Sequence, residues 1–358
     1  MNRQLRAWLE GPWPIVVALA VLPLIVANTA LVTQATTILA FALLALGLHV
    51  VVGYTGALHL GIAGFFGIGA FTTGILTTKN YPFQFDFISG TLAAMALASL
   101  AGFVLATPTL RLRGDYLAIV TLGFGEVVKV SLKNLENITR GKQTLNLIPR
   151  PVELTEATTA WGPYLESLAM YFIAFIFLVL AVALLLNLER SRLGRAWISL
   201  REDELAATSM GVQAARSKLI AFSIGSALAG LAGAVYVTNL TNTSDPDSSY
   251  EFNTSIITLC CLILGGLGGI RGTLLGVLIL QGLDAILIPR IDELIAILNP
   301  NSPELLKLKS WRLMVFGLSL ILMMRFRPEG LLPARRTQLE LHEHGSQGDS
   351  LAANGGAA

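Results

Sequence analysis

Long apolar runs are the feature that most constrains how this chain can fold. A helix needs about 20 consecutive apolar residues to cross the hydrocarbon core of a bilayer, and about ten runs approach that length. Hydrophobic residues make up 54% of the sequence and charged residues 13%, whereas a soluble domain carries about a quarter charged residues. The sequence therefore predicts an all-α fold, a polytopic membrane helix bundle of about ten spans. The predicted cores are 13–32, 35–52, 56–76, 88–106, 115–132, 168–188, 218–237, 255–270, 272–289 and 311–326.

Three places in this assignment leave alternatives open. The second and third spans meet at Gly53–Gly56, and the eighth and ninth meet at Gly265–Gly272; a broken or re-entrant segment at either joint would change the count. Arg3 and Arg6 precede an apolar stretch, as in a secretory signal. We interpret Trp13–Val32 instead as a retained first helix, because it is long enough to span and another span follows at once.

The distribution of basic residues predicts the orientation. If the N-terminus is inside, most Lys and Arg fall at inner ends, which is the positive-inside pattern, and both termini are cytoplasmic. Residues 1–336 then form one transmembrane domain with an outer loop at 133–167, and 337–358 form a disordered cytoplasmic tail. The inner basic residues are Arg3, Arg6, Arg111, Arg113, those of 189–218, Arg271, Arg325, Arg327, Arg335 and Arg336.

The inner loop at 189–218 is densely charged. Charge of this density cannot lie in hydrocarbon, so the loop must lie in water on the cytoplasmic side. Its interior, Arg201–Gly211, contains good helix formers and ends on a glycine that suits a C-cap. A short charged helix held between two spans suggests a docking element for a soluble partner. The alternative is an ordinary basic loop that only fixes orientation.

The third segment carries far more glycine than a simple spanning helix would. Glycine at this density suggests backbone that faces a cavity, because irregular backbone at membrane depth is tolerated where protein or water satisfies it. We predict that this segment lines a translocation path, with His59 either contacting a substrate or hydrogen-bonded in the interior. The candidate path residues here are Tyr54, Gly56, His59, Gly61 and Gly64.

Two carboxylates lie within predicted spans. Glu126 is about ten residues into the fifth span, where a charge must face protein or water, so it is a sixth candidate path residue. Lys129 follows at i+3 and could pair with it on the same helix face. Structural pairing and a role in the path are both open, and Asp284 is a second, weaker candidate.

Small residues recur at a four-residue step in several predicted helices. Such faces let helix backbones approach closely in lipid. We predict helix packing within the chain, with a substrate path or a subunit seam as alternatives. The residues are Gly225, Ala229 and Gly233 in the seventh span, and Gly268, Gly272 and Gly276 across the joint of the eighth and ninth spans.

No pattern in the sequence supports catalysis. The histidines make no metal-binding pair in the membrane, Cys260 and Cys261 suit small core residues, and no nucleophile motif is present. The glycine-rich stretch Gly265–Gly272 lacks the lysine of a nucleotide-binding loop. We therefore predict a protein that is not an enzyme and needs no cofactor or metal of its own. If ATP drives it, another chain hydrolyses the ATP.

Six stretches, in order and over nearly the whole membrane domain, resemble the permease subunits of bacterial branched-chain amino acid ABC importers, specifically the second permease of the heterodimer. They are GYTGALHLGIAGFFGIGAF (53–71), RLRGDYLAIVTLGFGEVVK (111–129), GRAWISLREDELAATSMGV (194–212), KLIAFSIGSALAGLAGAVY (218–236), LILGGLGGIRGTLLGV (262–277) and RFRPEGLLP (325–333). One segment departs from the family pattern: TRGKQTLNLIPRP at 139–151 replaces its TGG…NGI-like sequence.

The resemblance implies a multi-pass protein of the bacterial inner membrane with the vitamin B12/ribose-type permease architecture. Its implied partners are a homologous permease, two cytoplasmic ATPases that bind the ATP, and an extracytoplasmic solute-binding protein. Glu204, Ala206, Ala207 and Gly211 fall where the family carries its ATPase-coupling motif. We add Arg201, Glu202 and Asp203 to the predicted coupling residues because they lie in the same charged helix.

The predicted function is that of a permease subunit of an ATP-binding cassette importer for branched-chain or other hydrophobic amino acids. The same machine could carry urea, amides, a sugar or polar amino acids, since the departure at 139–151 faces the binding protein. An alternative of another class is an ion-coupled secondary transporter that uses Glu126 and Asp284.

Overall fold

The computed structural model describes residues 12–16, 19, 28–79, 81–82, 84–109, 112, 114–141, 145, 148–151, 162–241, 243, 246–266, 269–298, 311–327 and 330–332. Within these ranges the chain is helical and forms no strand. The helices are α3 (Thr29–Leu48), α4 (Ile62–Thr77), α5 (Phe87–Thr109), α6 (Asp115–Asn134), α7 (Glu136–Thr139), α8 (Gly162–Arg190), α9 (Arg192–Glu202), α10 (Glu204–Ser209), α11 (Ala214–Leu240), α12 (Pro246–Ser249), α13 (Phe252–Gly265), α14 (Ile270–Gly282), α15 (Ile288–Leu298) and α16 (Arg312–Phe326), with π-helical segments η1 (His49–Tyr54) and η3 (Leu283–Leu287).

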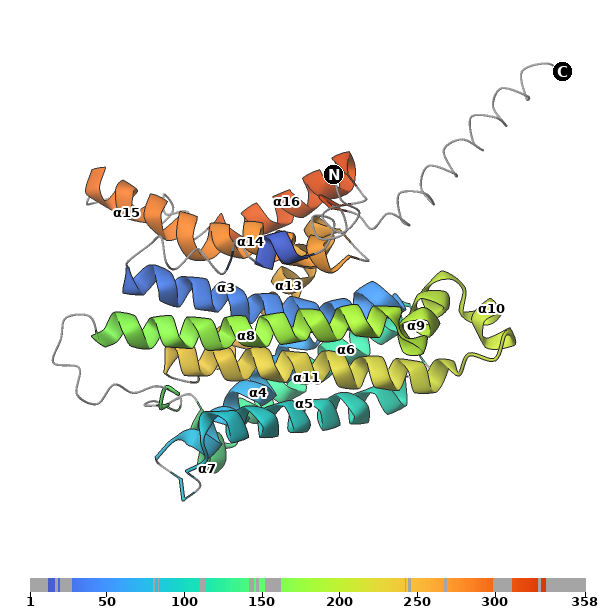
Figure 1. Cartoon of the computed structure of the whole chain (residues 1–358), viewed down its shortest axis with the longest axis horizontal. Coiled ribbons are helices and arrows are strands. Elements are labelled where there is room, and N and C mark those ends of the chain that lie inside the picture. The colour runs from blue at the N-terminus through green and yellow to red at the C-terminus, as the bar shows by residue number, and fades with distance from the viewer. Residues whose placement is uncertain are drawn as a thin grey trace, which may run out of the picture.

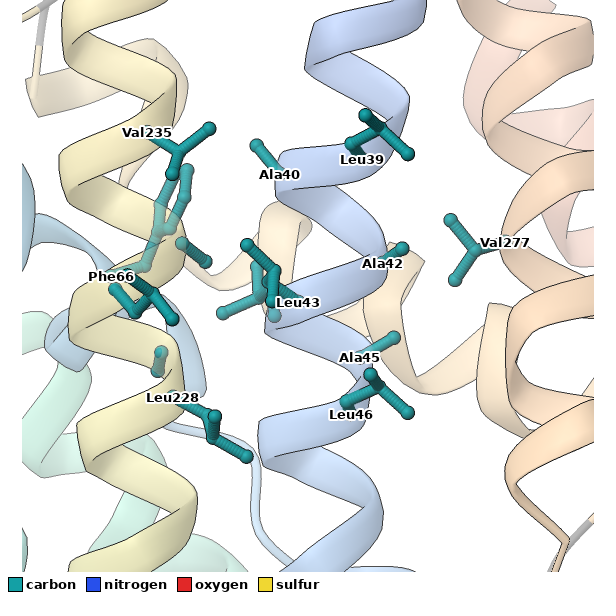
Figure 2. Close-up of a cluster of buried hydrophobic side chains, with 14 of the residues drawn as sticks. Leu39, Ala40, Ala42, Leu43, Ala45, Leu46, Phe66, Leu228, Val235 and Val277 are labelled. Carbon is teal, nitrogen blue, oxygen red and sulfur yellow. The ribbon is translucent and has the colours of Figure 1, made fainter. Parts of the chain in front are cut away.

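Helix α3 is the centre of the bundle. It is apolar on all sides, and a helix of that kind is stable when other helices surround it. Leu43 points toward Phe66 of α4 and toward α11, while Ala42 and Ala45 face the side on which Val277 of α14 lies (Figure 2). Helices α8 and α11 run alongside α3, with α4 and α5 beyond them (Figure 1). The core is therefore built outward from one buried helix.

Small residues bring the backbones of this bundle into contact. A Cβ built on Gly225 would lie 2.7 Å from the Gly47 carbonyl oxygen in α3, and one built on Gly233 would lie 2.1 Å from the Phe66 carbonyl oxygen in α4. Ala229, between them on α11, is fully buried. The four-residue face of α11 thus packs against two different helices of the same chain.

The joint at Gly265–Gly272 is a tight hairpin between α13 and α14. A Cβ on Gly272 would lie 2.4 Å from the Gly265 carbonyl oxygen, and one on Gly276 would lie 2.0 Å from the Cys261 carbonyl oxygen, so the two helices are antiparallel and in backbone contact. Gly268 lies outside the described residues. Leu331 and Leu332 donate backbone hydrogen bonds to the carbonyls of Leu264 and Gly265, which satisfies the end of α13.

The joint at Gly53–Gly56 is a break. Helix α3 continues as η1 to Tyr54, the chain leaves the helix at 56–61, and α4 begins only at Ile62. The third predicted span, 56–76, is therefore wrong at its start. The break is stabilised from outside: the Leu60 amide donates to Thr121 Oγ1 at 3.1 Å and the Ala63 amide donates to Ser255 Oγ at 3.1 Å.

Among the described residues, five helices are long and apolar enough to cross a membrane: Thr29–Tyr54, Phe87–Thr109, Gly162–Arg190, Ala214–Leu240 and Ile270–Glu293. The predicted boundary between the first two spans, at 33–34, is wrong because α3 already begins at Thr29. The Asn28 side chain caps it by accepting from the Ala30 amide at 3.0 Å. Half of the predicted first span, residues 17–18 and 20–27, lies outside the described residues.

The predicted outer loop 133–167 is only partly exposed. Leu145 and Ile148 are buried; Leu145 exchanges hydrogen bonds with Thr243, and the Ile148 amide donates to the Thr241 carbonyl. Both side chains lie near Gly74, so this part of the loop covers one end of α4. Burial of these apolar side chains removes their surface from water, so this part of the loop packs against the bundle. Residues 152–161 and the tail 337–358 lie outside the described residues.

Candidate functional site

The charged loop at 189–218 forms two short helices that project beyond the ends of α8 and α11 at one end of the bundle (Figure 1). The single helix predicted over Arg201–Gly211 is wrong. Helix α9 ends at Glu202, and Asp203 adopts an extended backbone with φ −151° before α10 begins. The Asp203 carboxylate accepts from the amides of Leu205 and Ala206 at 2.8 and 3.0 Å, the preferred role of aspartate at a helix N-cap.

Helix α10 ends in a Schellman motif at Gly211. The Gly211 amide donates to the Thr208 carbonyl and the Val212 amide donates to the Ala207 carbonyl, which satisfies the last carbonyls of the helix. Gly211 has φ +91°, a conformation that L side chains rarely adopt. The glycine therefore fixes the point where the chain turns back toward α11.

Inward-facing contacts hold the two helices against the bundle. The Trp197 side chain is fully buried and its indole nitrogen donates to the Ser217 carbonyl at 2.8 Å. Ala207 is buried on the inner side of α10. Glu204 and Lys218 form an ion pair at 2.7 Å, in which the two side chains are 27% and 16% exposed. These contacts join α9 and α10 to the first turns of α11.

Most of the predicted coupling residues therefore shape the loop. Arg201 bonds to η1, Asp203 caps α10, Glu204 pairs with Lys218, Ala207 is buried and Gly211 forms the turn. Glu202 and Ala206 are exposed.

Two large apolar side chains at α10 are exposed, and the sequence analysis did not select them. Leu205 is 68% exposed and Met210 is 87% exposed. Their signal was present in the sequence, since they are large apolar residues inside an otherwise polar and charged stretch. We define Leu205, Ala206 and Met210 as the outer surface of α10. This surface offers apolar area to a partner in water.

Charge reversal of the Glu204–Lys218 pair tests how firmly the loop is held. In Glu204→Lys two ammonium groups would face each other, so we expect the loop to open more easily by about 1 kcal/mol, which raises subtilisin cleavage within 189–218 about fivefold. The double variant Glu204→Lys/Lys218→Glu restores opposite charges and should return cleavage toward the wild-type rate. Equal cleavage of the wild type and both variants would show that the pair does not hold the loop.

The predicted path residues do not lie together. Gly61 and Gly64 form one group, at the contact of α4 with α6, and Tyr54 and Gly56 form another, beside the charged loop. Gly61 and Gly64 contact α6, where their Cβ atoms would lie 2.0 Å from the Thr121 carbonyl oxygen and 3.1 Å from the Gly125 Cα. Tyr54 is buried in η1 beside the charged loop. Gly56 lies against Arg201. His59 is buried, with its ring centroid 5.7 Å from that of Phe65 and 5.4 Å from that of Phe222.

Glu126 belongs to the α4–α6 group. The ion pair expected from its spacing to Lys129 is confirmed at 2.8 Å, and the Glu126 side chain remains 36% exposed. It lines a shallow hollow, which is partly open to the surface, together with Leu60, Ala63, Leu122, Gly125, Tyr250, Glu251, Phe252 and Ser255. Among the described residues, no three His, Cys, Asp or Glu side chains are placed to hold a metal ion.

Several apolar helices of spanning length, with a charged helical loop projecting at one end, define a multi-pass membrane protein. The chain belongs to the family described as "Branched-chain amino acid transport system / permease component", whose model matches residues 30–324. It is thus a permease subunit of an ATP-binding cassette importer.

Three relatives illustrate the range of the matches. The high-affinity branched-chain amino acid transport system permease protein LivM of Escherichia coli is 36% identical over 333 residues, covering 88% of this chain and 73% of the relative. The probable branched-chain amino acid transport permease protein LivM of Methanocaldococcus jannaschii is 26% identical over 326 residues, covering 82% and 91%. The autoinducer 2 import system permease protein LsrC of Yersinia enterocolitica is 25% identical over 250 residues, covering 69% and 64%. No solved structure matches the chain.

Proposed function

We propose that this permease carries branched-chain amino acids inward across the bacterial inner membrane and is driven by cytoplasmic ATPases that bind the outer surface of α10. The observation that carries the proposal is the arrangement of the loop: Arg201 and the Glu204–Lys218 pair tie it to the bundle, while the side chains of Leu205 and Met210 are largely exposed. An apolar surface held rigidly at one end of the spans can receive force from a soluble partner and pass it to the helices.

The remaining parts of the assembly belong to the same proposal. The chain pairs with a homologous second permease, a solute-binding protein delivers cargo at the opposite face, and the ATP is bound by the ATPase subunits. The loop 189–218 and both termini lie in the cytoplasm, as the positive-inside pattern favours. About ten spans in the vitamin B12/ribose-type arrangement would complete the permease domain of 1–336.

The named relatives support the choice of cargo. Two of the three carry "branched-chain amino acid" in their names, and the third, at lower identity, names autoinducer 2. Branched-chain amino acids are therefore the first cargo to test, and urea, short amides and polar amino acids are the alternatives. The transport would need no cofactor or metal on this chain.

A reconstitution experiment tests the proposal. The tagged permease is purified from its native membranes, the copurifying chains are identified, and the assembly is placed in vesicles with ATP enclosed on the loop side and binding protein outside. We expect uptake of labelled leucine, isoleucine and valine only with ATP. Uptake of urea or glutamate in place of leucine would contradict the cargo, and accumulation by the permease alone with only an ion gradient would contradict the ATPase-driven mechanism.

A further inference from the structure

The π-helical segment η1 ends without enough helical partners for its last carbonyls. A helix terminus leaves such groups to be satisfied by side chains, water or a local turn. Here the Val51 carbonyl accepts from the Thr55 hydroxyl at 2.7 Å, and the Val52 carbonyl accepts from the Thr55 and Gly56 amides. The Gly53 carbonyl accepts from Arg201 Nη1 at 2.6 Å, a donor 148 residues away in the sequence. One bond of this cap therefore comes from α9 of the charged loop.

The stem of Arg201 packs closely against the residue that follows the end of η1 by two positions, Gly56. A Cβ on Gly56 would lie 3.0 Å from Arg201 Cγ, and Gly56 has φ +68°, so the arginine stem lies across a glycine that L side chains could not easily replace. A Cβ on Gly53 would lie 2.7 Å from the His49 ring. Gly56 therefore allows the close approach of α9 to the end of η1, and Gly53 leaves room for the His49 ring within η1.

A second contact joins the same two elements one turn earlier in α9. The Trp197 and Tyr54 rings are stacked, with centroids 6.2 Å apart and planes 13° apart. Trp197 and Arg201 are four residues apart and so share one face of α9. That face contacts the end of η1, whereas the outer surface of α10 faces away from the bundle.

The segment beyond η1 reaches the residues that line the hollow beside Glu126. Residues 56–61 lead from η1 to α4, and Leu60, which bonds to Thr121 on α6, is part of the hollow's wall. The π-helical geometry of η1 is itself a form that recurs at functional sites and is less regular than an α-helix. A shift of α9 would therefore act on the least regular part of the central helix, and through it on 56–61.

We propose that Arg201 is a positioning residue that couples the charged loop to the break after η1 through its hydrogen bond to the Gly53 carbonyl. This inference rests on the proposed function, because it concerns how force received by α10 reaches the spans. Arg201 would then act within the permease, between α9 and η1, and not as a direct contact with the ATPase.

The test uses the complete importer in vesicles and measures leucine uptake and ATP hydrolysis in the same preparation. In Arg201→Ala we expect the ATPase subunits to remain bound and ATP hydrolysis to continue, while leucine taken up per ATP hydrolysed falls about tenfold, the size expected for loss of one charge-assisted hydrogen bond. Arg201→Lys keeps a charged donor without the planar guanidinium and should recover part of the ratio.

Arg195→Ala is the matched control. Arg195 also lies in α9 and its Nη1 also donates to a helix-terminal carbonyl, that of Arg190, at 2.8 Å, but this bond stays within the loop. Its uptake per ATP should equal that of the wild type within about twofold. If Arg201→Ala does not assemble, Arg201→Gln, which keeps a hydrogen-bond donor, and Arg201→Lys decide the question by the same ratio.

Three outcomes would overturn the inference, and each differs from failure of the proposed function. Unchanged uptake per ATP in Arg201→Ala would show that the bond transmits nothing. Loss of the bound ATPase in both Arg201→Ala and Arg201→Lys, with the permease still monodisperse, would make Arg201 an ATPase contact. An equal fall in Arg195→Ala would assign the effect to the loop in general. Failure of the proposed function would appear in the wild type, as uptake that does not require ATP.

Discussion

Replacing Gly69 by alanine is expected to lower the thermal midpoint of the purified permease by on the order of 5 °C or more, because one added carbon separates two helices of the core. A Cβ on Gly69 in α4 would lie 2.2 Å from the Gly230 carbonyl oxygen and 2.5 Å from the Gly230 Cα in α11. Backbone atoms cannot rotate away as side chains do. Helices α4 and α11 must therefore move apart, which weakens their packing against each other and against α5.

Gly317→Ala is the control for this substitution. Gly317 lies in α16, and a Cβ built there meets nothing within 4 Å. Alanine favours a helix over glycine by about 1 kcal/mol, so the control should be neutral or more stable than the wild type. Midpoints of heat-induced aggregation in one detergent measure both variants. If Gly69→Ala matched the wild type, the close approach of α4 and α11 would not limit stability.

The sequence predicted the long helices well because hydrocarbon imposes a simple rule on them. The run predicted at 168–188 lies within α8, Gly162–Arg190, and the run at 218–237 lies within α11, Ala214–Leu240. In both cases the helix is longer than the apolar run, because it continues through polar residues at its ends. Apolarity predicts the membrane-embedded core of a helix, and capping decides where the helix stops.

The breaks were harder to predict because they depend on partners that are distant in sequence. Glycine density marked the region after Tyr54, but the start of α4 at Ile62 depends on Thr121 and Ser255, which accept the Leu60 and Ala63 amides. The turn at Asp203 was available from local rules, since aspartate is a strong N-cap. It was missed because the surrounding residues are good helix formers.

The sequence predicted where the candidate site lies, but it predicted the roles of the individual residues less well. The loop and its residues lie together at one end of the bundle, yet Arg201 bonds to the Gly53 carbonyl and Glu204 pairs with Lys218. Charge alone does not reveal which side of a short helix faces the protein. Leu205 and Met210, the large apolar residues most exposed in this loop, were not predicted, because the prediction rested on the charged residues around them.

The double substitution Leu205→Asp/Met210→Asp is expected to abolish binding of the ATPase subunits and to lower ATP-dependent leucine uptake by about 100-fold or more. Each side chain is largely exposed on the outer surface of α10, at 68% and 87%. An apolar side chain at the centre of an interface contributes about 2 kcal/mol or more, and each 1.4 kcal/mol is tenfold in affinity. A carboxylate in its place would have to lose its hydration without a partner.

Ala215→Asp controls for the added charge, because Ala215 is exposed on the first turn of α11, within the same loop but outside α10. An acidic residue there suits the positive end of the helix and should leave the fold intact. Copurification of the ATPases, monodispersity of the permease and uptake are measured for all three proteins. ATPase binding that survives in the double variant would place the docking surface elsewhere and return the loop to the simpler role of fixing orientation. Loss of binding with a monodisperse permease would identify the two apolar side chains as the contact, since the charged residues around them are unchanged.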